Sequence, residues 1–312
     1  MVAVFQIVSK AGIPCLMILP VLVAHLLMPK DESWSEPNKP YRVAGNIYQV
    51  GTKGIGVYLI TTSKGHIVLD SSTKKGADVV EANIRTLGFK LSDVKFLIET
   101  HAHFDHVGGT AQLKAKSRAK LVAMAGDRFA LENGVHDGES NYKPEPFPPV
   151  KVDRIISDGG TLELGGIKLT AHATPGHTKG DTSWTMVIRD PKIQNGKPLR
   201  VIFYGSTTVA GNRLIGNTTY PNIVRDYRKS FATLRTLKAD IFLVNHPDFA
   251  DLAEKRKAQI AGKVDAFVVP NEFASFVKES AIDFEEALAK QRENHKPGQK
   301  STKERPGSHV CE

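Results

Sequence analysis

Three histidines and one aspartate lie within the six residues HAHFDH, positions 101–106. Neutral imidazole nitrogens and carboxylate oxygens are borderline ligands that suit Zn²⁺. Burying so many polar side chains without a partner would be costly, so this density favours a metal site. The alternative interpretation is a surface histidine cluster that holds no metal.

The segment follows the apolar run VKFLIET, positions 94–100, and precedes Gly108-Gly109. Residues i and i+2 at the end of a strand point the same way, so His101 and His103 can share one ion. After the chain turns, Asp105 and His106 face a second position. The spacing therefore predicts two adjacent metal positions.

Two more histidines stand in comparable places. His177 lies in a tight turn, TPGHT, after IKLTAHA, and His246 follows the apolar run DIFLV. Each alone could be a structural histidine. Together with the first segment they complete two sets of three ligands: His101, His103 and His177, and Asp105, His106 and His246. Three protein ligands per ion leave positions open, which is typical of a catalytic site.

The elements that must position these residues are mixed strands and helices. Strands are expected at 46–50, 56–61, 66–70, 94–99, 120–123, 153–156, 161–164, 167–172, 184–188, 200–204 and 240–244. Helices are expected at 77–87, 109–116, 225–237, 250–260 and 281–292. Alternation of the two types predicts two sheets covered by helices.

Four segments divide the 312 residues. Residues 1–28 contain an apolar run, 11–28, and are interpreted as a signal peptide or an N-terminal membrane anchor. Residues 29–40 are interpreted as a linker, and residues 41–292 as the catalytic domain. Residues 293–312 are polar and are predicted to be a disordered basic tail.

The net charge of +9 does not indicate a nucleic-acid partner. Residues 290–312 hold six basic and three acidic residues, a net charge of +3, and the remaining charge forms no long basic run. A solvated surface is therefore favoured, with no nucleic-acid motif present. Cys15 and Cys311 are not placed to brace a core, and no disulfide is predicted.

Over residues 40–265 the sequence resembles the metallo-β-lactamase superfamily, and within it subclass B3. The segments that carry the resemblance are HAHFDHVGG, TAHATPGHTKGDTSW, the stretch from Gly205 to Thr208 before GNRLIGNTTYP, and DYRKSFATLRTL before the strand that leads to His246. The resemblance implies an α/β fold, the four-layer αβ/βα sandwich. It also implies two Zn²⁺ ions at the two ligand sets, and it identifies Asp70, at the end of HIVLD, as a residue that orients the metal-binding loop.

Position 206 separates reactions within the superfamily. Many superfamily hydrolases have there an aspartate that bridges both metals, whereas this chain has Ser206, as subclass B3 enzymes do. A hydroxyl is a poor ligand at neutral pH, which leaves Ser206 free to hydrogen-bond a substrate. The resemblance implies that Ser206 and Thr208 hydrogen-bond the carboxylate of a β-lactam. A serine that only satisfies local backbone is the alternative. Lys179 and Asp181, which depart from the subclass pattern, are expected near the rim of the site.

The resemblance implies a zinc-dependent hydrolase that opens the β-lactam ring of penicillins, cephalosporins or carbapenems by attack of a metal-bound hydroxide, with Asp105 as a catalytic residue. One alternative is a zinc hydrolase of the same fold that acts on another ester, lactone or amide. A second alternative is a non-catalytic zinc-binding protein. The expected partner is a small-molecule substrate, and the protein is expected to be a monomer in the periplasm or secreted, or anchored to a membrane through residues 11–28.

Overall fold

The structure, a computed structural model, describes residues 32–141 and 144–295. The segment interpreted as a signal or anchor, both cysteines and most of the expected tail lie outside the described residues. Within the described part of the chain, no helix is long and apolar enough to cross a membrane.

Seven strands form the first sheet, in the order β1-β2-β3-β4-β5-β6-β7. Their bounds are β1 Tyr41–Ala44, β2 Ile47–Gln49, β3 Tyr58–Thr62, β4 Gly65–Leu69, β5 Val94–Ile98, β6 Lys120–Met124 and β7 Arg154–Ile156. The pairs from β1 to β4 are antiparallel, and those from β4 to β7 are parallel. The carboxyl ends of β4, β5 and β6 therefore meet at one edge of this sheet.

Five strands form the second sheet, in the order β12-β11-β10-β9-β8. Their bounds are β8 Thr161–Leu164, β9 Ile167–Ala173, β10 Thr182–Ile188, β11 Leu199–Tyr204 and β12 Ile241–Val244. Only β11 and β12 run parallel, with Tyr204 beside Val244 at their carboxyl ends.

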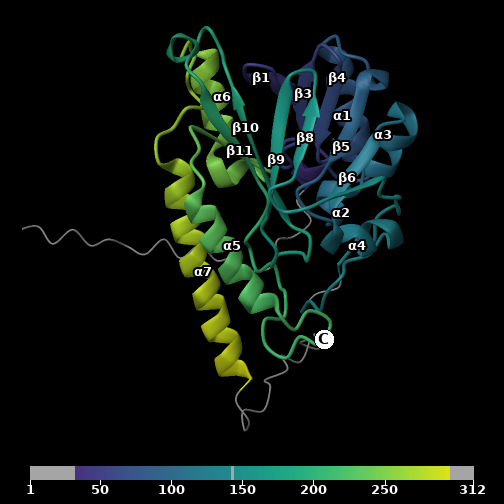
Figure 1. The fold of residues 1–312 in the computed structure, drawn as a ribbon, viewed down its shortest axis with the longest axis vertical. Helices are drawn as coiled ribbons and strands as arrows, with labels where there is room; N and C mark the ends of the chain where they lie inside the picture. The colour runs from purple at the N-terminus through teal and green to yellow at the C-terminus, as the bar shows by residue number, and fades with distance from the viewer. Residues whose placement is uncertain (1–31, 142–143, 296–312) are drawn as a thin grey trace, which may run out of the picture.

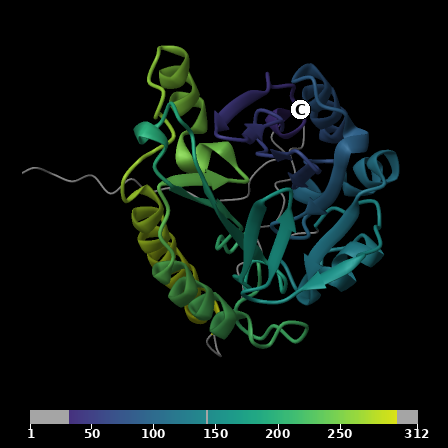
Figure 2. The same ribbon diagram turned by 45° about the horizontal axis from the view of Figure 1, so that its top comes forward.

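Helices cover the outer faces of both sheets (Figures 1 and 2). Their bounds are α1 Gly76–Thr86, α2 Phe104–Val107, α3 Thr110–Ser117, α4 Arg128–Asn133, α5 Ile223–Thr236, α6 Leu252–Ile260 and α7 Glu272–Asn294. Five short 3-10 turns complete the described elements: η1 Glu32–Trp34, η2 Leu91–Asp93, η3 Ala125–Asp127, η4 Gln194–Gly196 and η5 Pro247–Ala250.

Side chains alternate between two hydrophobic cores along the first sheet. Leu59 and Val68 join the core beneath α1 and α3, whereas Tyr58 and Leu69 join the core shared with the second sheet. Strands buried on both faces in this way belong to the inner layers of a sandwich. The four-layer αβ/βα fold expected from the sequence is confirmed.

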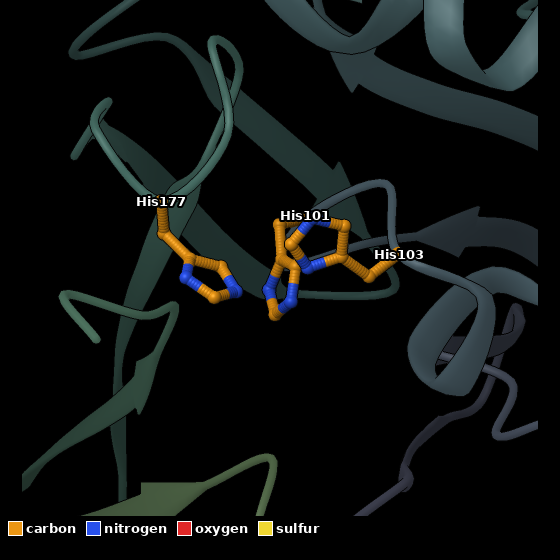
Figure 3. A group of neighbouring side chains, drawn as sticks. All are labelled: His101, His103 and His177. Atoms are coloured by element: carbon orange, nitrogen blue, oxygen red, sulfur yellow. The ribbon is translucent and has the colours of Figure 1, made fainter. Parts of the chain in front are cut away.

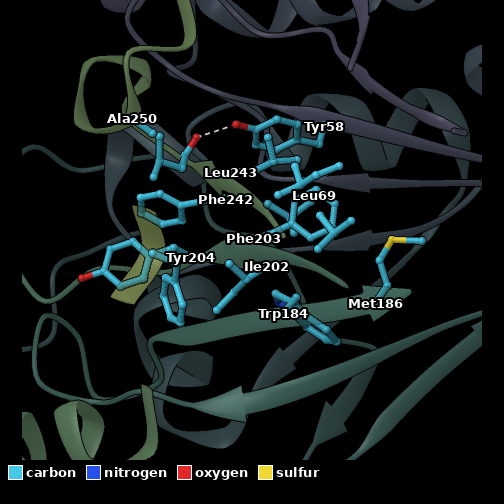
Figure 4. Close-up of a cluster of buried hydrophobic side chains, with 14 of the residues drawn as sticks. Tyr58, Leu69, Trp184, Met186, Ile202, Phe203, Tyr204, Phe242, Leu243 and Ala250 are labelled. Carbon is cyan, nitrogen blue, oxygen red and sulfur yellow. Dashed lines mark hydrogen bonds between the residues drawn. The ribbon is translucent and has the colours of Figure 1, made fainter. Parts of the chain in front are cut away.

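The core between the sheets also fixes one sheet against the other. Tyr58 on β3 donates a hydrogen bond of 2.7 Å from its hydroxyl to the carbonyl of Val244 at the end of β12 (Figure 4). Trp184 on β10 is fully buried and donates from its indole to the carbonyl of Glu99, 2.8 Å away. Both bonds lie where a strand of one sheet ends, so they align the two sets of strand ends.

Several elements differ from the sequence expectation. β1 and α4 were not expected, and α7 begins at Glu272 rather than at residue 281. The helix reaches back because Phe273 and Val277 continue the buried face of Ala281, Phe284 and Leu288. Its last turn extends to Asn294, two residues into the segment expected to be the tail.

Candidate metal centre

The HAHFDH segment leaves β5 at the carboxyl edge of the first sheet. His101 and His103 lie in the extended stretch after the strand, and Asp105 and His106 lie in α2. His177 follows β9, and His246 follows β12, so the second sheet supplies one ligand to each group.

The three histidines His101, His103 and His177 form the first group (Figure 3). One ring nitrogen from each lies within 4.8 Å of the others. The His101 ring stands nearly perpendicular to both other rings, at 89°. Three nitrogens that converge from perpendicular planes suit one tetrahedral ion.

In the rings of His177 and His101, the outer nitrogen, which is the one that points away from the centre of the group, contacts protein groups. Nδ1 of His177 donates to the carbonyl of Thr208, 2.7 Å away. Nδ1 of His101 lies 3.2 Å from the hydroxyl of Thr100 and 3.6 Å from the carboxylate of Asp181. Partners on the outer nitrogen fix the tautomer and leave the inner nitrogen for a metal.

The inner nitrogen of His101 supplies the test of metal fit. Nε2 of His101 is buried and has no hydrogen-bond partner in the described part of the protein. A buried polar nitrogen without a partner is costly in a native fold and requires an explanation. An ion at the centre of the three rings supplies that partner, so the residues present fit a metal.

Asp105, His106 and His246 form the second group, again with ligand atoms within 4.8 Å of one another. One carboxylate oxygen of Asp105 lies 3.1 Å from Nε2 of His106 and 3.4 Å from Nε2 of His246. The structure thus brings all six residues predicted as ligands into two groups, as the sequence spacing requires.

Electrostatics keep most of the rings neutral and the carboxylate charged. Burial lowers the pKa of His101 and His103 well below the usual range and that of His177 to about 3. Burial alone would raise the pKa of Asp105, but the imidazoles of His106 and His246 hold it well below its usual value. These are the protonation states that metal ligands need.

Asp70 lies behind the metal-binding loop, where the sequence interpretation places it. Its carboxylate accepts hydrogen bonds from the backbone N–H and the hydroxyl of Thr100, at 2.7 and 2.9 Å. The same carboxylate lies 3.8 Å from Nδ1 of His106. Its backbone has a positive φ of 63°, which Asp tolerates better than most residues.

Asp127 is a buried residue that the sequence did not reveal. Its carboxylate accepts from the N–H of Ala102, from the hydroxyl of Thr178 and from the N–H of Gly180, all at 2.8–2.9 Å. It therefore ties the loop of His101 to the loop of His177. No spacing or motif around Asp127 marks it as different from a turn-forming aspartate.

The expected rim position of Asp181 is wrong. Asp181 is fully buried, and its carboxylate accepts from the hydroxyl of Thr174 at 2.6 Å and from the N–H of Ser206 at 2.8 Å. Lys179 is partly exposed and pairs with Asp137. The difference arises because Asp181 directly precedes β10, where its side chain accepts a hydrogen bond from the backbone N–H of Ser206 beneath the site.

The hydroxyls of Ser206 and Thr208 lie side by side near His177. The two oxygens are 3.1 Å apart, and that of Thr208 lies 3.2 Å from Nδ1 of His177. Ser206 is buried and accepts from the N–H of Thr208 at 3.2 Å, which is the local role considered as the alternative. Thr208 is partly exposed.

Trp34 reaches the second group from the segment expected to be a linker. Its ring packs on His246 and on Phe104, with centroids 5.5 and 5.9 Å apart. Its carbonyl accepts from the hydroxyls of Thr52 and Ser72. The sequence signal that could have marked Trp34 for a contact with the site is an aromatic residue within a polar stretch.

Comparison with known proteins gives one family. The sequence model of the metallo-beta-lactamase superfamily matches residues 51–190. BJP-1, a subclass B3 metallo-β-lactamase of Bradyrhizobium japonicum, is 41% identical, with a TM-score of 0.80 over 85% of this chain and 99% of that chain. FEZ-1 from Legionella gormanii, a metallo-β-lactamase, is 37% identical, with a TM-score of 0.78 over 82% of this chain and 98% of that chain.

Curated relatives match over a shorter stretch. A hydroxyacylglutathione hydrolase of Rhodopseudomonas palustris is 28% identical over 132 residues, 40% of this chain and 44% of that protein. An acyl-coenzyme A thioesterase of Gallus gallus is 30% identical over 94 residues, 27% of this chain and 34% of that protein. The chain thus spans less than half the length of these two relatives.

Proposed function

Because this chain belongs to the metallo-β-lactamase superfamily, we propose that it is a zinc-dependent hydrolase that opens the ring of β-lactams. The fold, the family and the six converging ligands make this chain a hydrolase of the superfamily with two metal-binding groups. The substrate and the identity of the metal are the parts proposed.

The single observation that carries the choice of substrate is the paired hydroxyls beside His177. Ser206 stands at the position where the resemblance implies a metal-bridging aspartate in other superfamily hydrolases, and the hydroxyl of Thr208 lies 3.1 Å from that of Ser206. Thr208 is the more exposed of the two, and Ser206 accepts from its backbone N–H. The pair can thus donate to an anionic group of a substrate, and a charge-assisted bond of this kind contributes about 1.5–3 kcal/mol.

Zinc is proposed from the donor set. Three imidazoles in one group, and two imidazoles with one carboxylate in the other, suit Zn²⁺ better than Mg²⁺ or Ca²⁺, which prefer oxygen ligands. When bound, the two ions supply a water molecule of lowered pKa and polarise the carbonyl that is attacked.

The chain's own residues hold the charges in place. Asp105 is ionised because His106 and His246 lower the pKa of its carboxyl, so its oxygens can accept a hydrogen bond from the attacking water. His101, His103 and His177 remain neutral because burial lowers their pKa. Thr208 and Ser206 position the substrate by its carboxylate.

A thioester hydrolase is the second candidate. The curated relatives include hydroxyacylglutathione hydrolases and an acyl-coenzyme A thioesterase. Ser206 argues against this reading, because it removes the bridging carboxylate expected for that class.

The test is a substrate panel with the purified protein loaded with zinc. The panel holds a penicillin, a chromogenic cephalosporin, a carbapenem, S-lactoylglutathione and an acyl-coenzyme A. We expect turnover of at least one β-lactam with kcat/KM far above that for either thioester. Preferred turnover of a thioester would overturn the proposal in favour of the second candidate.

Thr208→Val supplies the matched variant, since it removes the hydroxyl and keeps the volume. The lost bond predicts that KM for β-lactams rises about tenfold or more, with a smaller effect on kcat. Thr170→Val on β9, at a position that pairs with Thr161 and Thr185, is the control and leaves KM unchanged. An unchanged KM in Thr208→Val would remove the role given to this hydroxyl.

A further inference from the structure

We propose that His136 is a positioning residue of the three-histidine group, which holds His103 in the tautomer and orientation that metal binding requires. The inference rests on the metal-binding part of the proposed function. It does not depend on which substrate the enzyme hydrolyses.

The contact is direct. Nε2 of His103 lies 3.0 Å from Nδ1 of His136, and the two rings have centroids 5.0 Å apart at an interplanar angle of 31°. Because Nε2 of His103 is engaged here, Nδ1 of His103 is the nitrogen left for the ion. His136 thus contacts the second ring nitrogen of His103. Thr208 does the same for His177, and Thr100 and Asp181 do so for His101.

The hydrogen bond has only one polarity that leaves His103 able to bind a metal. A lone pair on Nδ1 of His103 requires its proton on Nε2, which then donates to Nδ1 of His136. The proton of His136 must accordingly lie on its Nε2. That nitrogen is buried and has no hydrogen-bond partner in the described part of the protein, so the contact with His103 is the hydrogen bond that sets the tautomer of His136.

The loop around His136 is fixed on both sides. Asp137 forms an ion pair of 2.7 Å with Lys179, two residues beyond His177. Glu139 accepts from the backbone N–H and the hydroxyl of Thr218, at 2.7 and 2.6 Å. These contacts fix the loop that carries His136, and one of them joins this loop to the turn that carries His177.

Gly138 leaves the space that the ring needs. A Cβ on Gly138 would lie 3.0 Å from Nε2 of His136, closer than nine in ten contacts of real Cβ atoms. A larger residue there would require the ring of His136 to shift by a few tenths of an ångström. The glycine at position 138, the ion pair of Asp137 and the contact between the two rings all bear on how His136 lies against His103.

Metal affinity tests the inference, because loss of such an orienting partner weakens binding about 10–100-fold. His136→Phe keeps a ring of similar size and removes the acceptor. His136→Asn keeps an acceptor near the position of Nδ1. His172→Phe, which replaces a partly buried histidine bonded to Thr185 on the second sheet, is the matched control. Each full-length variant is stripped of metal and titrated with Zn²⁺ against a chromophoric chelator.

We expect His136→Phe to weaken one of the two binding steps about 10–100-fold and to leave the other within about threefold. His136→Asn and the control should bind both ions within about threefold of the parent protein. Two unchanged steps in His136→Phe would overturn the inference. Equal weakening in His136→Asn and His136→Phe would also overturn it, since packing rather than the acceptor would then be at work.

Thermal unfolding of the metal-free variants separates misfolding from loss of the ligand partner. An equal unfolding temperature in parent and His136→Phe is expected. A large drop together with weakening of both steps would place His136 in the fold rather than in the site, and would overturn the inference. Absence of β-lactam turnover in the parent protein, with the expected binding pattern intact, would instead overturn the proposed function alone.

Discussion

At the scale of single residues, burial lowers the pKa of most of the histidines predicted as metal ligands. Burial lowers the pKa of His177 to about 3, compared with about 6.5 in an unfolded chain. The folded state therefore keeps the ring neutral across the acidic range, whereas the unfolded chain protonates it below about pH 6.5. His177 is therefore available as a ligand. The same burial lowers the unfolding free energy of the metal-free protein at acidic pH.

This difference predicts a pH dependence with a definite sign. Between about pH 6.5 and pH 3 the unfolded state binds the proton on His177 and the folded state does not, so stability is lost as pH falls. In the metal-free protein, His177→Gln should reduce the slope of the unfolding free energy against pH in this window, by up to about 1.4 kcal/mol per pH unit. Chemical denaturation at a series of pH values measures both slopes, and equal slopes would contradict the assignment.

The site could be predicted to the level of its ligands, because metal binding needs specific residue types at specific spacings. HAHFDH, His177 and His246 each follow an apolar strand, and that order identified all six members of the two groups. Asp127 could not be found in this way, because its role depends on two loops that meet only in the fold.

At the scale of elements, the loops after β5 and β9 are joined by one carboxylate. Asp127, at the end of η3, accepts from Ala102 in the first loop and from Thr178 and Gly180 in the second. Gly176 lets the second loop approach α5, because a Cβ there would lie 2.6 Å from the ring of Tyr227 and the φ of 141° disfavours other residues.

Asp127→Ala should separate these loops. It leaves three buried donors without an acceptor, at about 1–3 kcal/mol for each one that water cannot satisfy. We expect a fall in unfolding free energy of about 3 kcal/mol or more and weaker binding at the three-histidine group, whose members sit on both loops. Denaturant unfolding and zinc titration measure the two effects.

Asp283→Ala, at an exposed position of α7, is the control and should change neither quantity. Stability and zinc affinity equal to the parent protein in Asp127→Ala would mean that the loops are held together by other contacts.

Element type was predictable where hydrophobic periodicity was strong. The strands that lead to the ligands, β5, β9 and β12, were all expected from their apolar runs. β1 and the start of α7 were missed because their burial depends on partners in other elements, which the local sequence does not show: Tyr41 stacks on Phe267, and Phe273 packs on Phe242 of β12.

At the scale of the whole molecule, each metal group joins the two sheets. The first sheet supplies His101 and His103 to one group and Asp105 and His106 to the other. The second sheet supplies His177 and His246. A bound ion would thus link the two halves of the sandwich at their shared edge, in addition to the core between them.

This arrangement predicts that zinc stabilises the entire fold. Ligand at a hundredfold excess over Kd adds about 2.7 kcal/mol per site when only the folded state binds. The unfolding temperature of the metal-free protein should therefore rise by several degrees with micromolar Zn²⁺ and stay unchanged with the same concentration of Mg²⁺, which imidazole ligands do not suit. An equal response to both ions would contradict the histidine-based site.

Turnover of a chromogenic cephalosporin and a carbapenem before and after metal removal is the measurement that decides whether this protein is a zinc-dependent β-lactamase. Incubation with a chelator, dialysis and stepwise return of Zn²⁺ give activity as a function of bound metal. We expect hydrolysis that is lost with the chelator and restored as zinc fills the two groups. A protein that binds two zinc ions and hydrolyses neither compound would contradict it.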